Sequence, residues 1–176
     1  LFGLNTKGFN VVQQQKLTAS DGASSDRFGK SVSVYEDYAL IGAHYEDDKG
    51  VNSGAAYILK KNGSTWSQQQ KLVASDGGDD DNFGLSVSIY KDYALIGASA
   101  EHSDSAEVAY IFKRIGSTWN QQQKITASDS ASNDKFGYSV SLYEDYALIG
   151  AFQEGNNGSA YIFKRNGSTW TQQQKL

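Results

Sequence analysis

The sequence predicts an all-β fold, a β-propeller of four-stranded antiparallel blades. The first observation is a repeat: residues 28–43, Phe-Gly-Lys-Ser-Val-Ser-Val-Tyr-Glu-Asp-Tyr-Ala-Leu-Ile-Gly-Ala, return almost letter for letter at 83–98 and 136–151. The second is the period of this repeat, which lies near the ~50 residues of a propeller blade. The third is composition, because 11 tyrosines, eight phenylalanines and 18 glycines, without proline, suit strands joined by many turns.

Each repeat contains four expected strands. In the first repeat they cover residues 29–35, 38–43, 55–60 and 65–72. Glu36-Asp37 fills a two-residue loop between the first two strands, and Asn62-Gly63 between the last two is a strong hairpin signal. This order of short strands and tight turns predicts an up-and-down sheet in every repeat.

Hydrophobicity separates the inner strands from the outer ones. The first two strands of each repeat carry small or apolar residues on both faces, as strands covered on both sides do. The fourth strand, Trp66-Ser-Gln-Gln-Gln-Lys-Leu in the first repeat, is polar and is expected outermost. We interpret its glutamine tract as a solvated edge blunted by the lysine, with a functional low-complexity tract as the alternative.

The tetrapeptide Gln-Gln-Gln-Lys marks the units of the repeat. It begins at Gln13, Gln68, Gln121 and Gln172. The whole chain, residues 1–176, is interpreted as one partial propeller domain with three full blades at about 13–67, 68–120 and 121–176. Residues 1–12 align with 160–171 and are expected to be a remnant strand pair of a preceding blade.

Five short motifs follow one another in each repeat with small variations: Gln-Gln-Lys-Leu, Ala-Ser-Asp, Phe-Gly-x-Ser-Val, Ala-Leu-Ile-Gly-Ala and Ala-Tyr-Ile-Phe. This series resembles the FG-GAP repeat, which builds the β-propeller of integrin α subunits and of many bacterial and protist surface proteins. The resemblance covers essentially all of residues 13–176. It implies a non-catalytic binding or adhesion module at an extracellular or cell surface.

The chain departs from that family at the position after Gly-Ala. Where the family has proline, the three repeats have His44, Ser99 and Phe152. The chain also lacks the calcium loop that many blades of the family carry between their first two strands, Asp-x-Asp-x-Asp-Gly. A two-residue turn stands there instead.

Two residues cannot surround an ion that takes six to eight oxygen ligands. The metal site of the family is therefore not carried over to this chain, and no cofactor is expected. Calcium keeps one weak candidate site, an acidic cluster whose spacing matches no known calcium loop closely. Its members are Asp76, Asp79, Asp80 and Asp81.

All of the length variation lies in the loop between the second and third strands. In an up-and-down blade this loop and the connection to the next blade lie at the same end, and variable loops in repeat proteins are often the binding face. Fifteen of the chain's 20 acidic residues fall in these loops, opposed there only by Arg27, Lys49 and Lys135. The sequence thus predicts an acidic end, with solubility as the alternative explanation.

The candidate ligand-binding residues lie in the loops between the second and third strands. They are His44, Glu46, Asp47, Asp48, Glu101, His102, Asp104, Phe152 and Glu154. The two histidines are interpreted as surface residues, with metal ligation or general-base chemistry as the alternative. Basic residues approach the opposite end of the blades. They are Lys60, Lys61, Lys113, Arg114, Lys164 and Arg165.

One tryptophan recurs in each repeat, at Trp66, Trp119 and Trp170. Repeated aromatic residues are expected to pack between blades, and stacking on sugar rings is the alternative, as in a propeller lectin. Asn-Gly-Ser sequons begin at Asn62, Asn157 and Asn166. They are glycosylation candidates or incidental products of Asn-Gly turns.

Composition excludes several classes of function. A net charge of −4 and a pI near 5.1 argue against a nucleic-acid partner. Without cysteine, the chain has no disulfide, thiolate metal site or cysteine nucleophile. No apolar run approaches the ~20 residues of a membrane span, and no signal peptide is recognisable. Because the chain also lacks methionine, it is expected to be a processed product, an excised piece or an engineered chain.

Three blades cannot close a ring, since propellers close with about four to eight. The chain is therefore expected to need further blades or a second copy of itself. The leading functional hypothesis is a protein- or glycan-binding adhesion module that uses the acidic end. A glycan-binding lectin and a purely structural, self-assembling unit are the alternatives, and an enzyme is not expected.

Overall fold

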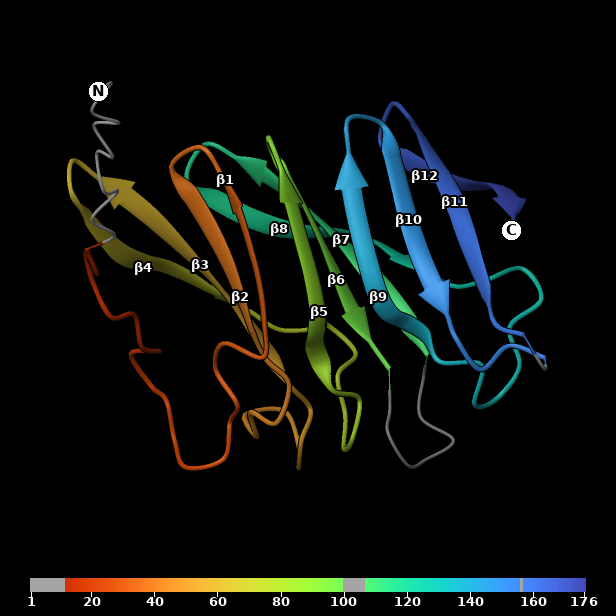
Figure 1. Cartoon of the computed structure of the whole chain (residues 1–176), viewed down its shortest axis with the longest axis horizontal. Coiled ribbons are helices and arrows are strands. Elements are labelled where there is room, and N and C mark those ends of the chain that lie inside the picture. Colours follow the sequence, from red (N-terminus) through yellow and green to blue (C-terminus); the bar gives the residue numbers. More distant parts are fainter. Residues whose placement is uncertain (1–11, 100–106, 156) are drawn as a thin grey trace, which may run out of the picture.

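The computed structural model describes residues 12–99, 107–155 and 157–176, which form three four-stranded antiparallel sheets (Figure 1). The first sheet contains β1 (Ser31–Tyr35), β2 (Tyr38–Ala43), β3 (Ala55–Asn62) and β4 (Thr65–Leu72). The second contains β5 (Phe83–Tyr90), β6 (Tyr93–Ala98), β7 (Val108–Ile115) and β8 (Thr118–Ile125). The third contains β9 (Phe136–Tyr143), β10 (Tyr146–Ala151), β11 (Ser159–Asn166) and β12 (Thr169–Lys175).

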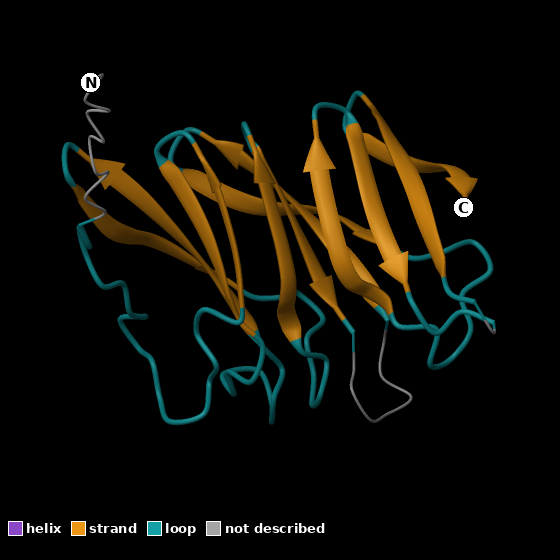
Figure 2. Ribbon diagram, viewed as in Figure 1, coloured by secondary structure: helices purple, strands orange, loops and turns teal. Residues whose placement is uncertain are grey.

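The fold expected from the sequence is confirmed. In each sheet the strands follow one another in chain order, and the sheets stand side by side as propeller blades (Figure 2). The described ranges contain strands, turns and loops only, and within them there is no helix of the length and hydrophobicity that crossing a membrane requires. The first inner strand is two residues shorter than expected, and the third strand reaches Asn62 at the hairpin turn.

The sequence repeats are offset from the sheets. The middle unit, residues 68–120, starts within the outer strand β4 of the first sheet and ends inside the outer strand β8 of the second. The sheets themselves span residues 31–72, 83–125 and 136–175. The proposed remnant at 1–12 lies outside the described residues except for Val12.

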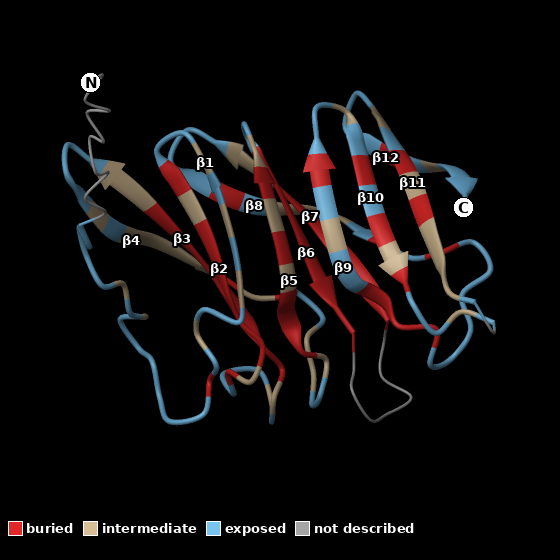
Figure 3. Cartoon of the chain, viewed as in Figure 1, coloured by how far each residue is buried: buried red, intermediate tan, exposed pale blue. Residues whose placement is uncertain are grey.

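The hydrophobic cores lie between the sheets (Figure 3). One core joins the first and second sheets, with Leu40 and Ile58 packed against Phe83 and Tyr110. The next repeats this arrangement between the second and third sheets. Because each sheet buries one face against each neighbour, the middle sheet is covered on both faces, which explains the apolar residues on both faces of its inner strands.

Close approach of neighbouring sheets depends on the glycine of the Leu-Ile-Gly-Ala motif. A Cβ on Gly42 would lie 1.9 Å from the carbonyl oxygen of Gly84, and one on Gly97 would lie 1.9 Å from that of Gly137. Only glycine allows backbones to come this close. The inner strands of successive blades can therefore pack directly on one another.

The glutamine tracts lie at a partly solvated edge, as expected, and they also join the blades, which was not expected. The third glutamine of each tract, Gln15 or Gln70, reaches the backbone of Trp66 or Trp119 in the next sheet. The first glutamine reaches back, as Gln121 Oε1 accepts a hydrogen bond from the Ser75 N–H at 2.9 Å. The outer position expected for these strands is confirmed.

Residues 12–20 occupy the place of an outer strand before the first sheet. Gln15 makes the same contacts with Trp66 that Gln70 makes with Trp119. Leu17 and Ala19 pack against the first sheet. This segment has no strand partner among the described residues.

Candidate functional site: the acidic loop end

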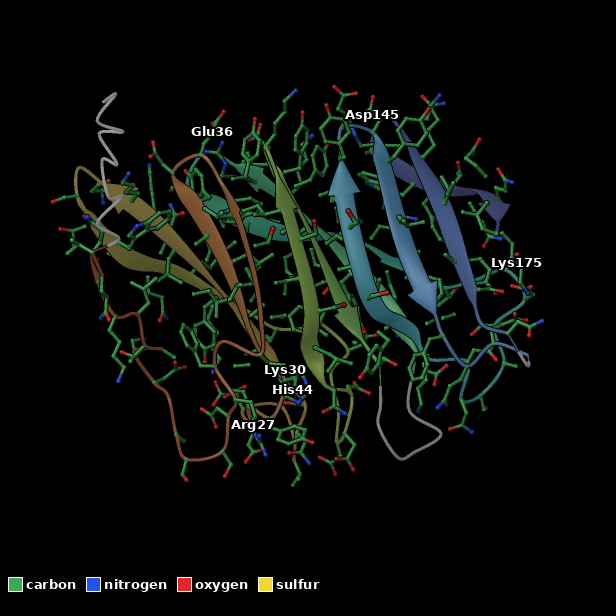
Figure 4. All side chains as sticks on the ribbon, in the orientation of Figure 1. Arg27, Lys30, Glu36, His44, Asp145 and Lys175 are labelled. Atoms are coloured by element: carbon green, nitrogen blue, oxygen red, sulfur yellow. The ribbon has the colours of Figure 1, made fainter. Side chains whose placement is uncertain are left out.

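The loop between the second and third strands of each blade, which we call the 2–3 loop, emerges at the same end of the molecule as the connections between blades, as predicted. We call this end the loop end; it comprises the described parts of residues 18–30, 44–54, 73–82, 99–107, 126–135 and 152–158. Figure 4 shows Arg27, Lys30 and His44 there, whereas Glu36 and Asp145 lie at the opposite end. The two kinds of loop thus form one surface carried by three sheets.

Lys71, at the end of β4, is surrounded by carboxylates. Its Nζ lies 2.8 Å from Asp21 Oδ2 and 2.8 Å from Glu46 Oε1, and it also bonds Asp48. Burial opposes the charge of Lys71, but these three partners raise its pKa above the usual range. The Lys71 hydrogen bond lowers the pKa of both Asp21 and Asp48.

The same arrangement recurs in the other two blades. Lys124 Nζ lies 2.6 Å from Asp76 Oδ2, and the Tyr110 hydroxyl donates to Asp76 Oδ1 at 3.0 Å. Lys175 Nζ lies 2.6 Å from Asp129 Oδ2 and 2.7 Å from Glu154 Oε1. In each case the aspartate of the Ala-Ser-Asp motif, on the connection before a blade, is tied to the lysine of that blade's outer strand.

Because of these three lysines, the loop end carries more positive charge than the sequence predicted. Only Arg27, Lys49 and Lys135 were expected to oppose the acidic residues there, but each outer strand ends at the loop end and places its lysine among them. Lys30 also lies at this end (Figure 4). Carboxylates still exceed cations, since Lys71 alone is shared by three of them.

The longest 2–3 loop is bonded to the connection that follows its own blade. Val51 N–H donates to Asp79 Oδ1 at 2.9 Å, Asn52 Nδ2 donates to Asp80 Oδ1 at 2.9 Å, and Asp80 N–H donates to the Val51 carbonyl at 2.7 Å. Asp47 Oδ1 accepts from the Asn52 N–H. The loop is thereby held at the joint of the first and second blades.

The four aspartates of the weak calcium candidate have separate partners. Asp76 bonds Lys124 and Tyr110, Asp79 and Asp80 bond the 2–3 loop, and Asp81 accepts from the Gly78 N–H at 2.8 Å. Burial raises the pKa of Asp81. Within the described ranges no three His, Asp or Glu side chains are arranged to hold a metal ion. The cluster proposed from sequence does not converge on one point.

The predicted ligand residues divide into exposed and buried ones. Asp47, Asp48 and Phe152 are exposed, and the Phe152 ring packs against Tyr138 with centroids 4.6 Å apart. His44 and Glu46 are buried, so the interpretation of His44 as a surface residue was wrong and neither side chain forms an accessible surface. Burial raises the pKa of Glu46. Glu154 is half-buried beside Lys175 and Ser159. Glu101, His102 and Asp104 lie outside the described residues.

A buried ion pair that was not expected from the sequence joins the second and third blades. The Lys135 backbone N–H donates to Glu107 Oε2 at 2.7 Å, and Lys135 Nζ lies 3.5 Å from Glu107 Oε1. Both side chains are almost fully buried. Lys135 was assigned to the loop end from sequence, but its pairing depends on the packing of two blades, which no local motif reveals.

Two of the three tryptophans pack between blades, as expected. Trp119 lies edge-on to Tyr38 of the first blade, and Trp170 lies edge-on to Tyr93 of the second. Each is only 2 % exposed. Trp119 and Trp170 therefore cannot stack on a sugar ring, whereas Trp66 is only partly buried.

The opposite end carries mixed charges. Arg114 bonds Asp92 and lies over the Tyr38 ring, and Arg165 bonds Asp145 and lies over the Tyr93 ring. A groove of about 490 Å³ runs between the second and third blades at this end. It is lined by Tyr90, Lys91, Asp92, Tyr93, Glu144, Asp145 and Arg165. Two of the six cations predicted for this end, Arg114 and Arg165, are thus paired with acidic turn residues.

Comparison with known proteins agrees with the fold. A europium-containing methanol dehydrogenase of known structure matches with a TM-score of 0.53 and 9% sequence identity. The match covers 84% of this chain, which spans 25% of the dehydrogenase chain. At this identity the likeness concerns the fold alone. A search of curated proteins found no match.

The family is shown by three consecutive matches to a sequence model of the FG-GAP repeat. They cover residues 11–59, 66–112 and 119–163. Each match ends in the third strand of a sheet, and the second and third matches begin in the outer strand of the sheet before it, which is the offset between repeats and sheets described above. The matches cover well over half of the sequence. The chain therefore belongs to the FG-GAP repeat family.

Proposed function

We propose that the chain is a non-catalytic binding module of an extracellular or cell surface, which holds a basic protein partner on its loop end. The observation that carries the proposal is a group of four exposed carboxylates at the joint of the first and second blades. They belong to Asp47, Asp48, Asp79 and Asp80. We call this group the acidic joint.

The acidic joint suits a protein partner better than a small ligand. Asp47, Asp79 and Asp80 are fixed by hydrogen bonds around residues 51 and 52, so their charges are held in place before binding. The charges lie on protruding loops, and preorganised surface charge steers and orients a partner of opposite sign. Asp48 also bonds Lys71, which fixes the fourth charge of the acidic joint.

The proposed extracellular or cell-surface location rests on the resemblance to FG-GAP repeats of surface proteins. The sequon residues Asn62, Asn157 and Asn166 are exposed, so a glycan could be accommodated at each. A lectin function has less support, because Trp119 and Trp170 are buried. A glycan array would distinguish the two classes of ligand.

The test is calorimetric titration of the full chain with a decalysine peptide. We expect binding that weakens as salt is added, because exposed charges are screened. Replacement of all four joint residues by asparagine keeps each acceptor oxygen, and with it the loop geometry, but should abolish binding. The matched control is Glu36→Gln with Glu144→Gln at the opposite end, which should bind as well as the unaltered chain. Equal binding by both variants would contradict the proposal.

A further inference from the structure

The interface between the first and second blades and the interface between the second and third contain equivalent hydrogen bonds. Ser31 Oγ donates to the Gly84 carbonyl at 2.8 Å, and the Ile89 N–H donates to Ser33 Oγ at 3.1 Å. Between the second and third blades, Ser86 and Ser88 repeat both bonds with Gly137 and Leu142 at 2.7 and 2.9 Å. Every blade thus offers two serine hydroxyls on the side that faces the following blade.

The third blade presents this side uncovered. Its serines at the same positions are Ser139 and Ser141, both exposed. Leu148 is 43% exposed, whereas Leu40 and Leu95 at the same position are fully buried. Hollows of about 160 and 210 Å³ lie over this surface. We call it the trailing face; it consists of Ser139, Ser141, Tyr143, Tyr146, Leu148, Gly150 and Ile162.

The first blade presents the complementary side uncovered. Val34 is 67% exposed, whereas Ile89 at the same position of the second blade is 4% exposed. Val32 is equally exposed, and Gly29 holds the position of Gly84, whose carbonyl accepts the serine bond. We call Gly29, Val32 and Val34 the leading face. The chain therefore carries both halves of an interface that it already forms twice internally.

We infer that a second copy of this chain docks its leading face onto the trailing face. Ser139 Oγ then donates to the Gly29 carbonyl, and the Val34 N–H donates to Ser141 Oγ. Val32 and Val34 fill the hollows over Leu148 and Gly150, where the absence of a Cβ on glycine admits the incoming strand. Two copies joined in this way at both ends make six blades, a number with which propellers close.

One segment of the chain, residues 12–19, must be displaced when the leading face docks onto the trailing face. Residues 12–19 hold, on the first blade, the place that β12 and Leu176 of the incoming copy take. The two segments carry the same contacts, since Gln174 and Leu176 correspond to Gln15 and Leu17. β12 is hydrogen-bonded to β11 along its length, whereas residues 12–19 have no strand partner among the described residues. Residues 12–19 are therefore displaced, and Gln174 takes over the bonds to Trp66.

The test is the mass of the full chain in solution by multi-angle light scattering. We expect twice the 19.2 kDa of one chain. Leu148→Asp on the trailing face and Val34→Asp on the leading face should each reduce the mass to that of one chain. Ile115→Asn is the matched control, because Ile115 is an exposed apolar residue that belongs to neither face. Asparagine occurs at its position in the other two repeats, so this variant should fold and remain dimeric. Circular dichroism checks that every variant is folded.

Mixing the two charged variants tests which faces meet. The Leu148→Asp chain keeps its leading face and the Val34→Asp chain keeps its trailing face, so an equimolar mixture should recover dimers joined by one interface. A contact between two trailing faces would instead leave Val34→Asp dimeric and give no recovery on mixing. Either that result or a single-chain mass for the unaltered protein overturns the inference.

Discussion

Gln70 on β4 and Trp119 on β8 are joined by two hydrogen bonds between neighbouring blades. The Trp119 N–H donates to Gln70 Oε1 at 2.8 Å, and Gln70 Nε2 donates to the Trp119 carbonyl at 2.7 Å. The side-chain amide thus supplies, for one residue, the pairing that an adjacent strand would give. Gln15 with Trp66 and Gln123 with Trp170 repeat the bond pair.

Gln70→Ala should therefore loosen the joint between the first two blades. It leaves the backbone N–H and carbonyl of buried Trp119 without their partner, which should lower the free energy of unfolding by about 1–3 kcal/mol. Urea denaturation followed by tryptophan fluorescence measures this. Gln173→Ala is the control and should change stability little, because Gln173 bonds Thr171 and Gln172 of its own strand. Equal losses for both variants would show that the bond pair contributes nothing specific.

The strands could be predicted from the sequence because their causes are local. Alternation of small and apolar residues sets the inner strands, and the two-residue turn at Glu36 and the Asn62-Gly63 turn set the register of each hairpin. The glutamine bonds could not be predicted in this way. They connect residues about 50 positions apart, and they depend on how one blade is rotated against the next.

The candidate site was only partly predictable. Strand parity correctly assembled the acidic loops at one end, and the same parity could have placed Lys71 there, at the end of the outer strand. Burial of His44 and Glu46 was not predictable, because it depends on how the 2–3 loop folds back on itself and, for Glu46, on the contact with Lys71. The spacing of aspartates at 76–81 also gave no sign that hydrogen bonds direct them to different partners.

Gly97→Ala should separate the second and third blades. The new Cβ would lie 1.9 Å from the Gly137 carbonyl oxygen, a backbone atom that cannot move without shifting a strand, so we expect a loss of at least about 3 kcal/mol. Gly150→Ala is the matched control, since its nearest obstacle is the Ser139 hydroxyl, which can rotate away. Both variants should carry Leu148→Asp, so that single chains are compared. Thermal unfolding midpoints that fall equally would contradict the close approach.

Lys71→Met should destabilise the loop end at neutral pH. It leaves the carboxylate of buried Glu46 without its cation, and breaking a buried pair costs about 3–5 kcal/mol. The double variant Lys71→Met, Glu46→Gln removes the unpaired charge and should recover most of the loss. Denaturation midpoints of the three proteins measure the effect. Failure of the second substitution to restore stability would mean that Lys71 acts through Asp21 and Asp48 instead.

Acid should weaken the blades through the Ala-Ser-Asp aspartates. The Lys124 hydrogen bond, opposed by partial burial and aided by Tyr110, holds the pKa of Asp76 below its ordinary value of 3.8. Because the folded-state pKa is lower than the unfolded one, this stabilisation is complete above about pH 4 and is lost as pH falls through the lowered pKa. Asp76→Asn should be less stable at pH 7 and should lose less on acidification. Parallel pH profiles from urea titrations would contradict this.

Calcium should not stabilise this chain. The four aspartates at 76–81 are bonded to separate partners, so no single point offers the six to eight oxygens that calcium takes. We expect millimolar calcium chloride or EDTA to move the thermal midpoint by less than about 1 °C, whereas a ligand at a hundredfold excess over its Kd stabilises by about 2.7 kcal/mol. That would raise the midpoint by several degrees in a domain of this size. A rise of that size, lost on Asp79→Asn with Asp80→Asn, would establish a metal site in this loop.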